Sequence, residues 1–181
     1  MDTNSAWMAQ ELNKSGIWLR RRLSIGDVKE EIIAALEEDS RQASVILITG
    51  VLGPTAGYIT KPVLAEYFGA RLVMHEESLR RVTQIFERLN RPMIERNRKQ
   101  AELPDTCTVI PNDRGTAPGM WFEKNGKIFV SMPGVPHEMK GMVTHYVLPM
   151  LQRHFELPFI DHRTLLTSGI GESFLAERIA D

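Results

Sequence analysis

Apolar residues recur along the chain with two different spacings, which predict helices alternating with strands. Residues 28–36 carry apolar side chains at helical spacing and predict a helix that Asp27 caps. Residues 44–49 ("SVILIT") are apolar and β-branched throughout, as in a strand covered on both faces. Residues 17–25 ("IWLRRRLSI") alternate and predict another strand. The first half of the chain is therefore expected to have an α/β arrangement.

Capping residues and turns place the remaining predicted elements. A first helix capped by Asn4 or Ser5, a helix capped by Thr60, a short strand near 71–74 and a helix over 76–88 are expected. The second half is richer in strand patterns, and Asn125-Gly126 between two apolar runs predicts a hairpin. A long amphipathic helix follows, up to about Phe155.

This order of elements predicts a three-layer α/β/α sandwich with a mostly parallel sheet. Such folds usually begin with a central strand, so a first strand is expected upstream of Asp2 and is missing here. The pattern changes after Phe155, where a strand, a Gly-x-Gly turn and a helix follow. We therefore predict one domain over residues 1–155 and the beginning of a truncated second domain over 156–181.

Composition narrows the classes of function. The chain has 181 residues and a formal net charge of −1, which gives no electrostatic reason to expect nucleic acid as a partner. No apolar run approaches the roughly 18 residues that span a bilayer, and no secretory signal is visible. The single cysteine, Cys107, lies in an apolar stretch and is expected to be packed. A cytoplasmic location without a membrane partner is the expectation.

The glycine-rich segment after the strand at 44–49 is the first candidate site. Gly50, Gly53 and Gly57 permit close backbone approach before the helix that begins at Thr60. Lys61 adds a positive charge, and ligands of open α/β sheets bind beyond the carboxyl ends of strands. The residues fit two interpretations about equally, a phosphate site and a tight strand-to-helix turn.

Two further loops are expected to converge on this segment. The loop "NDRGTAPG" offers small residues that permit close ligand contact, although an ordinary surface loop fits as well. The loop "MPGVPHEM" ends at Glu138 in the first turn of a helix. This carboxylate either interacts with the helix dipole or binds a metal or a ribose.

Several stretches together resemble one family. "DTNSAWMAQEL", "TGVLGPT", "LAEYFG", "RPMIERNRKQAELP", "GTAPGMW" and "MPGVPHEMKGM" are similar to the N-terminal domain of the CinA (competence/damage-inducible protein A) family, in the family's order. That domain is similar to the molybdopterin-binding fold of MogA and MoaB. The resemblance implies a homodimer that binds a nucleotide-like ligand in the glycine loop. In some members the domain is a metal-dependent ADP-ribose pyrophosphatase that yields AMP and ribose 5-phosphate.

The resemblance implies a set of site residues and a divalent metal ion as cofactor. Glu138 and Asp2 are the implied catalytic residues. The implied ligand-binding residues are Thr49, Gly50, Gly53, Pro54, Thr55, Thr60, Asn112, Gly115, Thr116, Ala117, Gly119, Pro133 and Gly134. The tail, "TLLTSGIGESFLAERIAD", resembles the opening of the KH-like domain that follows in this family.

The sequence departs from the family in the glycine loop. Val51 replaces a glycine, and Gly57 and Tyr58 replace paired aspartates. Metal-assisted diphosphate cleavage needs carboxylates, so we expect nucleotide binding with impaired pyrophosphatase activity. Two alternatives stay open: an active hydrolase that uses Asp2, Asp113 or Glu138, and a non-catalytic module for dimerisation or partner binding. Molybdopterin handling rests on fold similarity alone.

Overall fold

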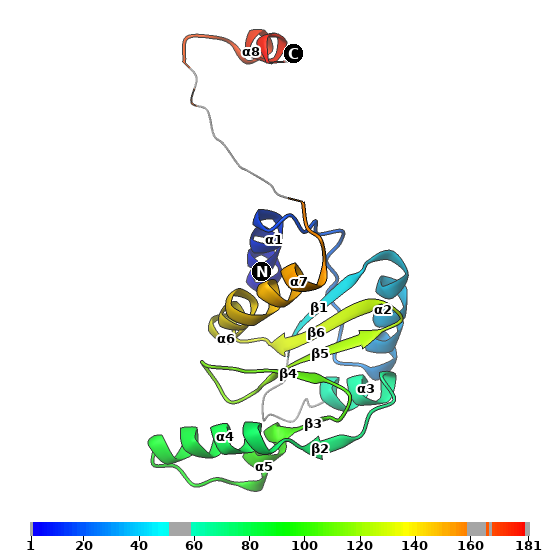
Figure 1. The fold of residues 1–181 in the computed structure, drawn as a ribbon, viewed down its shortest axis with the longest axis vertical. Coiled ribbons are helices and arrows are strands. Elements are labelled where there is room, and N and C mark those ends of the chain that lie inside the picture. Colours follow the sequence, from blue (N-terminus) through cyan, green and yellow to red (C-terminus); the bar gives the residue numbers. More distant parts are fainter. Residues whose placement is uncertain (1, 51–58, 159–165, 167, 180–181) are drawn as a thin grey trace.

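A computed structural model describes residues 2–50, 59–158, 166 and 168–179 of the chain (Figure 1). Its helices are α1 (Thr3–Lys14), α2 (Lys29–Gln42), α3 (Thr60–Tyr67), α4 (Glu76–Arg88), α5 (Glu95–Arg98), α6 (Pro136–Met142), α7 (Leu148–His154) and α8 (Glu172–Arg178). Its strands are β1 (Val45–Gly50), β2 (Leu72–Met74), β3 (Glu102–Pro104), β4 (Thr108–Ile110), β5 (Gly119–Lys124) and β6 (Lys127–Pro133). A 3₁₀ turn (Lys99–Ala101) follows α5, and a π-helical turn (Val143–Val147) joins α6 to α7.

The main sheet has the strand order β1-β6-β5-β4. Strand β1 runs parallel to β6, with Val45 opposite Ile128 and Gly50 opposite Pro133. The β5–β6 and β4–β5 pairs are antiparallel, so the described sheet is mixed, whereas a mostly parallel one was predicted. The predicted Asn125-Gly126 hairpin makes the β5–β6 pair antiparallel. Both residues have positive φ, 53° and 70°, which matches a two-residue turn between antiparallel strands.

The predicted three-layer arrangement is confirmed. Alternate residues of a strand face opposite sides of a sheet, and β6 sends Ile128, Val130 and Met132 to one core and Phe129 to the other. The first core is covered by α1, α6 and α7, and the second by α2 and α3. Figure 1 shows these two groups of helices on opposite faces of the sheet.

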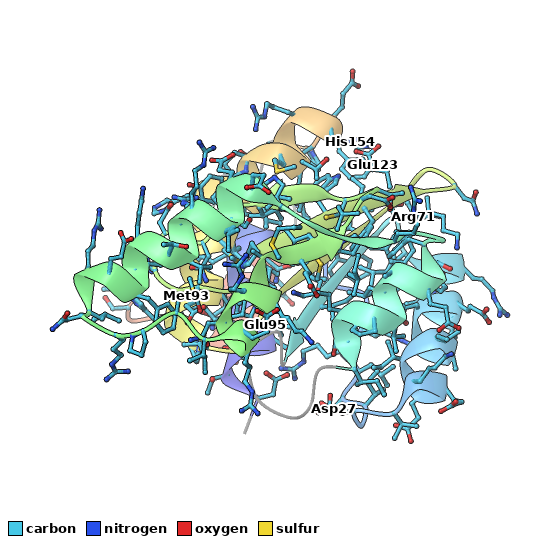
Figure 2. The ribbon with its side chains drawn as sticks, turned by 90° about the horizontal axis from the view of Figure 1, so that it is seen from below. Asp27, Arg71, Met93, Glu95, Glu123 and His154 are labelled. Carbon is cyan, nitrogen blue, oxygen red and sulfur yellow. The ribbon has the colours of Figure 1, made fainter. Side chains whose placement is uncertain are left out.

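A smaller antiparallel pair, β2 and β3, extends the molecule beside α4 and α5. Figure 2, seen from below, shows α4 in front of the main sheet. The buried Lys61 of α3 ties this part to the rest of the fold. Its Nζ donates to the carbonyl oxygens of Lys99, Gln100 and Glu102, at 3.3, 3.1 and 2.8 Å. This lysine therefore holds a backbone turn, whereas the sequence suggested that its charge was available to a ligand.

The predicted strand over residues 17–25 is wrong. This segment has no strand structure, and Trp18 is 90% exposed. Arg21 contacts Glu38 and Asp39 of α2, both at 2.7 Å. Charged side chains thus hold this segment against α2. Among the described residues, the segment pairs with no strand.

Three helix starts differ from the predicted caps. Asp2 caps α1, since its carboxylate accepts from the Ser5 N–H at 3.0 Å and from the Ser5 hydroxyl, whereas Asn4 or Ser5 was predicted. Helix α2 starts after Val28 and has no side-chain cap, so Asp27 does not cap it. Thr60 is the first residue of α3 and is buried, so it is not a cap.

The long helix predicted before Phe155 is present as α6, the π-helical turn and α7 in succession. Pro149 explains the interruption, because it has no N–H to donate to the carbonyl of residue 145. Within α8, no residue is buried, and the division at residue 155 stays a prediction. Across the described ranges, no helix has the length and apolar composition required to cross a bilayer.

Candidate functional site

The carboxyl ends of β1 and β6 meet at one edge of the sheet, as ligand sites of open α/β folds require. Because the two strands are parallel, Thr49 and Gly50 lie beside Pro133 and Gly134. A Cβ at Gly134 would lie only 3.1 Å from the carbonyl oxygen of Gly50. Four of the predicted ligand-binding residues are thus brought together here.

Asn4, in the first turn of α1, joins these two strand ends. Its Nδ2 donates to Thr49 Oγ1 at 3.2 Å and to the Gly134 carbonyl at 2.8 Å. Thr49 Oγ1 in turn donates to the Pro133 carbonyl at 3.1 Å. The Asn4 Oδ1 is buried and has no hydrogen-bond partner among the described residues. Asn4 was predicted only as a helix cap, so sequence reasoning missed this site residue.

The loop between β4 and β5 is fixed by the buried side chain of Asn112. Its Nδ2 donates to the Ala117 carbonyl at 2.9 Å and to Glu138 Oε2 at 2.6 Å, and its Oδ1 accepts from the Arg114 N–H at 3.0 Å. Nearby, Thr116 Oγ1 donates to Gln100 Oε1 at 2.6 Å. The predicted residues of this loop therefore form a rigid unit, attached to α6 and to the turn after α5.

Glu138 lies directly against Gly115. A Cβ built at position 115 would collide with the Glu138 carboxyl group. The glycine was predicted to admit a ligand, and in the structure it admits this carboxylate. Asn112 also donates to this carboxyl group, so a hydrogen bond and close packing together hold the Glu138 side chain in place.

This contact predicts a measurable coupling. We expect Gly115→Ala to displace the Glu138 side chain, break its bond to Asn112 and lower the free energy of unfolding by about 1–3 kcal/mol. In a Glu138→Ala background the same substitution should cost clearly less, because the obstacle has been removed. Urea unfolding of the four proteins measures this difference, and equal costs in both backgrounds would contradict the contact.

Asp113 is held by two partners of its own. Arg81 Nη2 donates to Asp113 Oδ1 at 2.6 Å, and the Tyr146 hydroxyl donates to Oδ2 at 2.6 Å. Both bonds lower the pKa of the Asp113 carboxyl, and the bond from the Tyr146 hydroxyl has the larger effect. Asp113 thus connects α4, the β4–β5 loop and the π-helical turn, and both of its oxygens already accept hydrogen bonds.

The other predicted residues lie in different surroundings. Asp2 is exposed, and its hydrogen bonds with Ser5 lower the pKa of its carboxyl. Gly119 begins β5, where a Cβ would lie only 3.1 Å from the carbonyl oxygen of Ser131. Close packing within the sheet therefore accounts for the glycine at this position. Gly53, Pro54 and Thr55, and the departures Val51, Gly57 and Tyr58, lie outside the described residues.

Metal-binding side chains do not cluster in the described residues. No group of three or more His, Cys, Asp or Glu side chains there is arranged to hold a metal ion. Cys107 is half-buried, and burial raises the pKa of its thiol to about 11, in line with the packed residue predicted from the sequence.

Comparison with known proteins identifies the family. The family model described as "Probable molybdopterin binding domain" matches residues 1–153. CinA-like proteins from Flavobacterium psychrophilum and Cytophaga hutchinsonii are 46% and 45% identical over 99% of this chain, which spans 43% of their length. A crystal structure of the protein CinA from Thermoplasma acidophilum superposes with a TM-score of 0.72 at 28% identity, covering 86% of this chain and 88% of that one. The chain therefore belongs to the probable molybdopterin binding domain family and is a CinA-like member of it.

Proposed function

We propose that the chain binds a nucleotide-type ligand, such as AMP or ADP-ribose, with a phosphate at the carboxyl ends of β1 and β6. The observation that carries the proposal is the contact of Asn4 with Thr49 and Gly134, which brings the start of α1 to these strand ends. The glycine-rich stretch from Gly50 leaves the sheet at the same edge. Backbone N–H groups at glycine turns and helix N-termini are the usual donors to phosphate.

The second part of the proposal is that diphosphate cleavage is impaired. Gly57 and Tyr58 stand where the resembling family has aspartates, so the loop from Gly50 to Lys61 has no carboxylate. The carboxylates at Asp2, Asp113 and Glu138 already accept hydrogen bonds from Ser5, from Arg81 and Tyr146, and from Asn112. The described residues therefore do not fit a divalent metal ion.

The binding test is a calorimetric titration with AMP and ADP-ribose. We expect binding in the millimolar range, and Asn4→Ala should weaken it about tenfold, or about 1.4 kcal/mol, because the two strand ends lose their shared donor. Asn13→Ala is the matched control, since Asn13 is exposed at the other end of the same helix. A flat titration with the unaltered chain at millimolar ligand would reject the proposal.

The catalytic part is tested by AMP release from ADP-ribose with Mg²⁺. We expect none from the unaltered chain and measurable release from the Gly57→Asp/Tyr58→Asp variant, which restores carboxylates to the loop. Release by the unaltered chain would instead support the hydrolase alternative. If the variant is also silent, these two positions do not account for the impairment.

The non-catalytic alternative makes a different prediction. A module for dimerisation or partner binding would form a stable dimer with no response to AMP. The homodimer implied by the resemblance and the cytoplasmic location expected from the composition are likewise proposals for this chain, and sedimentation with and without AMP tests the first of them.

A further inference from the structure

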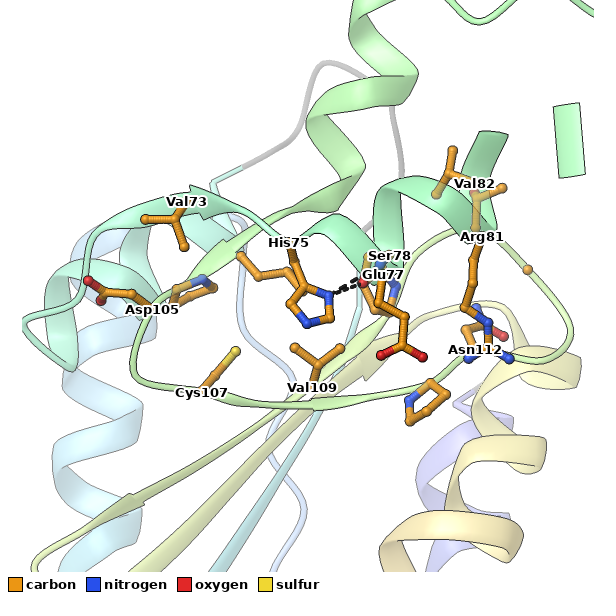
Figure 3. A pocket seen from close by; sticks show the side chains of 16 residues that line it. Val73, His75, Glu77, Ser78, Arg81, Val82, Asp105, Cys107, Val109 and Asn112 are labelled. Atoms are coloured by element: carbon orange, nitrogen blue, oxygen red, sulfur yellow. Dashed lines mark hydrogen bonds between the residues drawn. The ribbon is translucent and has the colours of Figure 1, made fainter. Parts of the chain in front are cut away.

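A pocket of about 380 Å³ opens between α4, the β2–β3 pair and the loop that precedes β5 (Figure 3). Its volume lies in the range of small-molecule sites. Its lining includes three of the predicted ligand-binding residues, Asn112, Gly115 and Thr116. The pocket therefore borders the same loop that contacts Glu138 at the start of α6.

The walls of this pocket combine apolar side chains with the charged side chains of Glu77, Arg81 and Asp105. Arg81 and Asp105 form ion pairs with Asp113 and Arg71. Val73, Val82, Leu103 and Val109 come from β2, α4, β3 and β4, and three prolines also line the pocket. Figure 3 shows Val73 and Val109 in the same cavity as the ring of His75. The aliphatic part of this lining suits the face of a flat ring.

His75 supplies a polar group whose hydrogen position follows from its contacts. Its Nδ1 accepts from the backbone N–H of Ser78 at 3.2 Å and lies 2.8 Å from the Ser78 hydroxyl. A backbone N–H always donates, so Nδ1 carries no proton and the neutral ring holds its proton on Nε2. Figure 3 shows Nδ1 turned toward Ser78 and the other ring nitrogen turned away from it. His75 thus presents one N–H donor to the pocket.

The lining of the pocket also offers an acceptor at Thr116. The Thr116 hydroxyl gives its proton to Gln100 Oε1 at 2.6 Å, so its oxygen accepts any further hydrogen bond. The Asn112 Nδ2 is already committed to Ala117 and Glu138. The His75 donor, the acceptors at Thr116 and Glu77, and the aliphatic part of the walls are complementary to a heteroaromatic ring that carries a ring-nitrogen acceptor and an amino donor.

We propose that this pocket holds the flat, amino-substituted heteroaromatic base of the ligand, while its phosphate lies at the ends of β1 and β6. The inference rests on the proposed function, since it assigns the two ends of the same ligand. The loop from Asn112 to Ala117 lines the pocket and contacts Glu138 of α6, the helix that follows the end of β6, so it lies on the path between the two regions.

The test uses adenosine, ribose 5-phosphate and AMP as separate probes in calorimetric titrations. His75→Asn removes the Nε2–H donor but keeps a residue favoured at the N-cap of α4. Val73→Trp fills the pocket from its rim, where Val73 is 42% exposed, and Val28→Trp is the control at a 43% exposed valine outside the pocket. We expect His75→Asn and Val73→Trp each to weaken adenosine and AMP at least tenfold without changing ribose 5-phosphate.

The outcomes separate this inference from the proposed function. If both pocket variants bind adenosine as tightly as the unaltered chain, the pocket does not hold the base. The same follows if AMP binds no tighter than ribose 5-phosphate. Either result leaves the proposed phosphate site in place. Adenosine binding that both variants weaken, with no binding of ribose 5-phosphate, would support the pocket and reject the phosphate site. If none of the three probes binds, both are rejected.

Discussion

Replacing Phe122 with alanine is expected to lower the free energy of unfolding by about 3–5 kcal/mol, the usual cost of deleting a fully buried aromatic ring. Phe122 lies in the core beneath α2 and α3 and is almost completely buried. Its ring stacks on Phe68 at a centroid separation of 4.1 Å, and Phe68 also makes an edge contact with Phe129. The substitution therefore opens a cavity within a group of aromatic rings that join β5 and β6 to α3.

Urea unfolding of the two proteins measures this loss as a shift of the midpoint at constant slope. Phe174→Ala is the control, because Phe174 on α8 is 66% exposed and its loss should change stability by less than about 0.5 kcal/mol. A cost below about 1 kcal/mol for Phe122→Ala would mean that the core is looser than the ring contacts indicate.

Stability is expected to rise with pH between about 8 and 10.5 because of Lys61. Burial lowers the pKa of Lys61 to about 8 from the ordinary 10.5, with a partly opposing effect from Glu102. Within this window the unfolded lysine still holds its proton while the folded one has released it. Raising the pH therefore favours the folded state, and the cost of the buried charge, on the order of 3 kcal/mol, is present in full only below the window.

The measurement compares the free energy of unfolding of the unaltered chain and a Lys61→Met variant from pH 7 to 10.5. Cys107 works in the opposite direction, since burial raises the pKa of its thiol from 9.0 to about 11. Its folded form keeps a proton that the unfolded form loses, so both proteins should carry Cys107→Ala. If the free energy of unfolding changes with pH in the same way in both proteins, folding does not lower the pKa of Lys61.

Local sequence signals predicted the elements whose interactions are local. The hairpin at Asn125-Gly126 follows from backbone preferences at two residues, and the predicted bounds of α4 at 76–88 match the structure. The segment 17–25 has strand-like alternation, but a strand needs a neighbour to pair with, and no local pattern reports one. Arg20 and Arg21 contact α2 instead.

The candidate site was predicted less completely, for a related reason. Glycines mark places of close approach without saying what approaches: at Gly115 it is Glu138 and at Gly119 it is the sheet itself. Asn4 acts through Thr49 and Gly134, which are far away in the sequence. Lys61 likewise bonds backbone carbonyls beyond residue 98, a role that its position beside a glycine loop does not reveal.

The pairing of β1 with β6 also has a consequence for how the chain folds. Val45 lies opposite Ile128, so this parallel ladder closes a loop on the order of 80 residues, at an entropic cost that local contacts do not repay. The β5–β6 hairpin closes through two residues and requires no such loop. We therefore expect hydrogen-exchange protection during refolding to appear in β5 and β6 before β1, and the proposed phosphate site at the β1–β6 edge to be completed last.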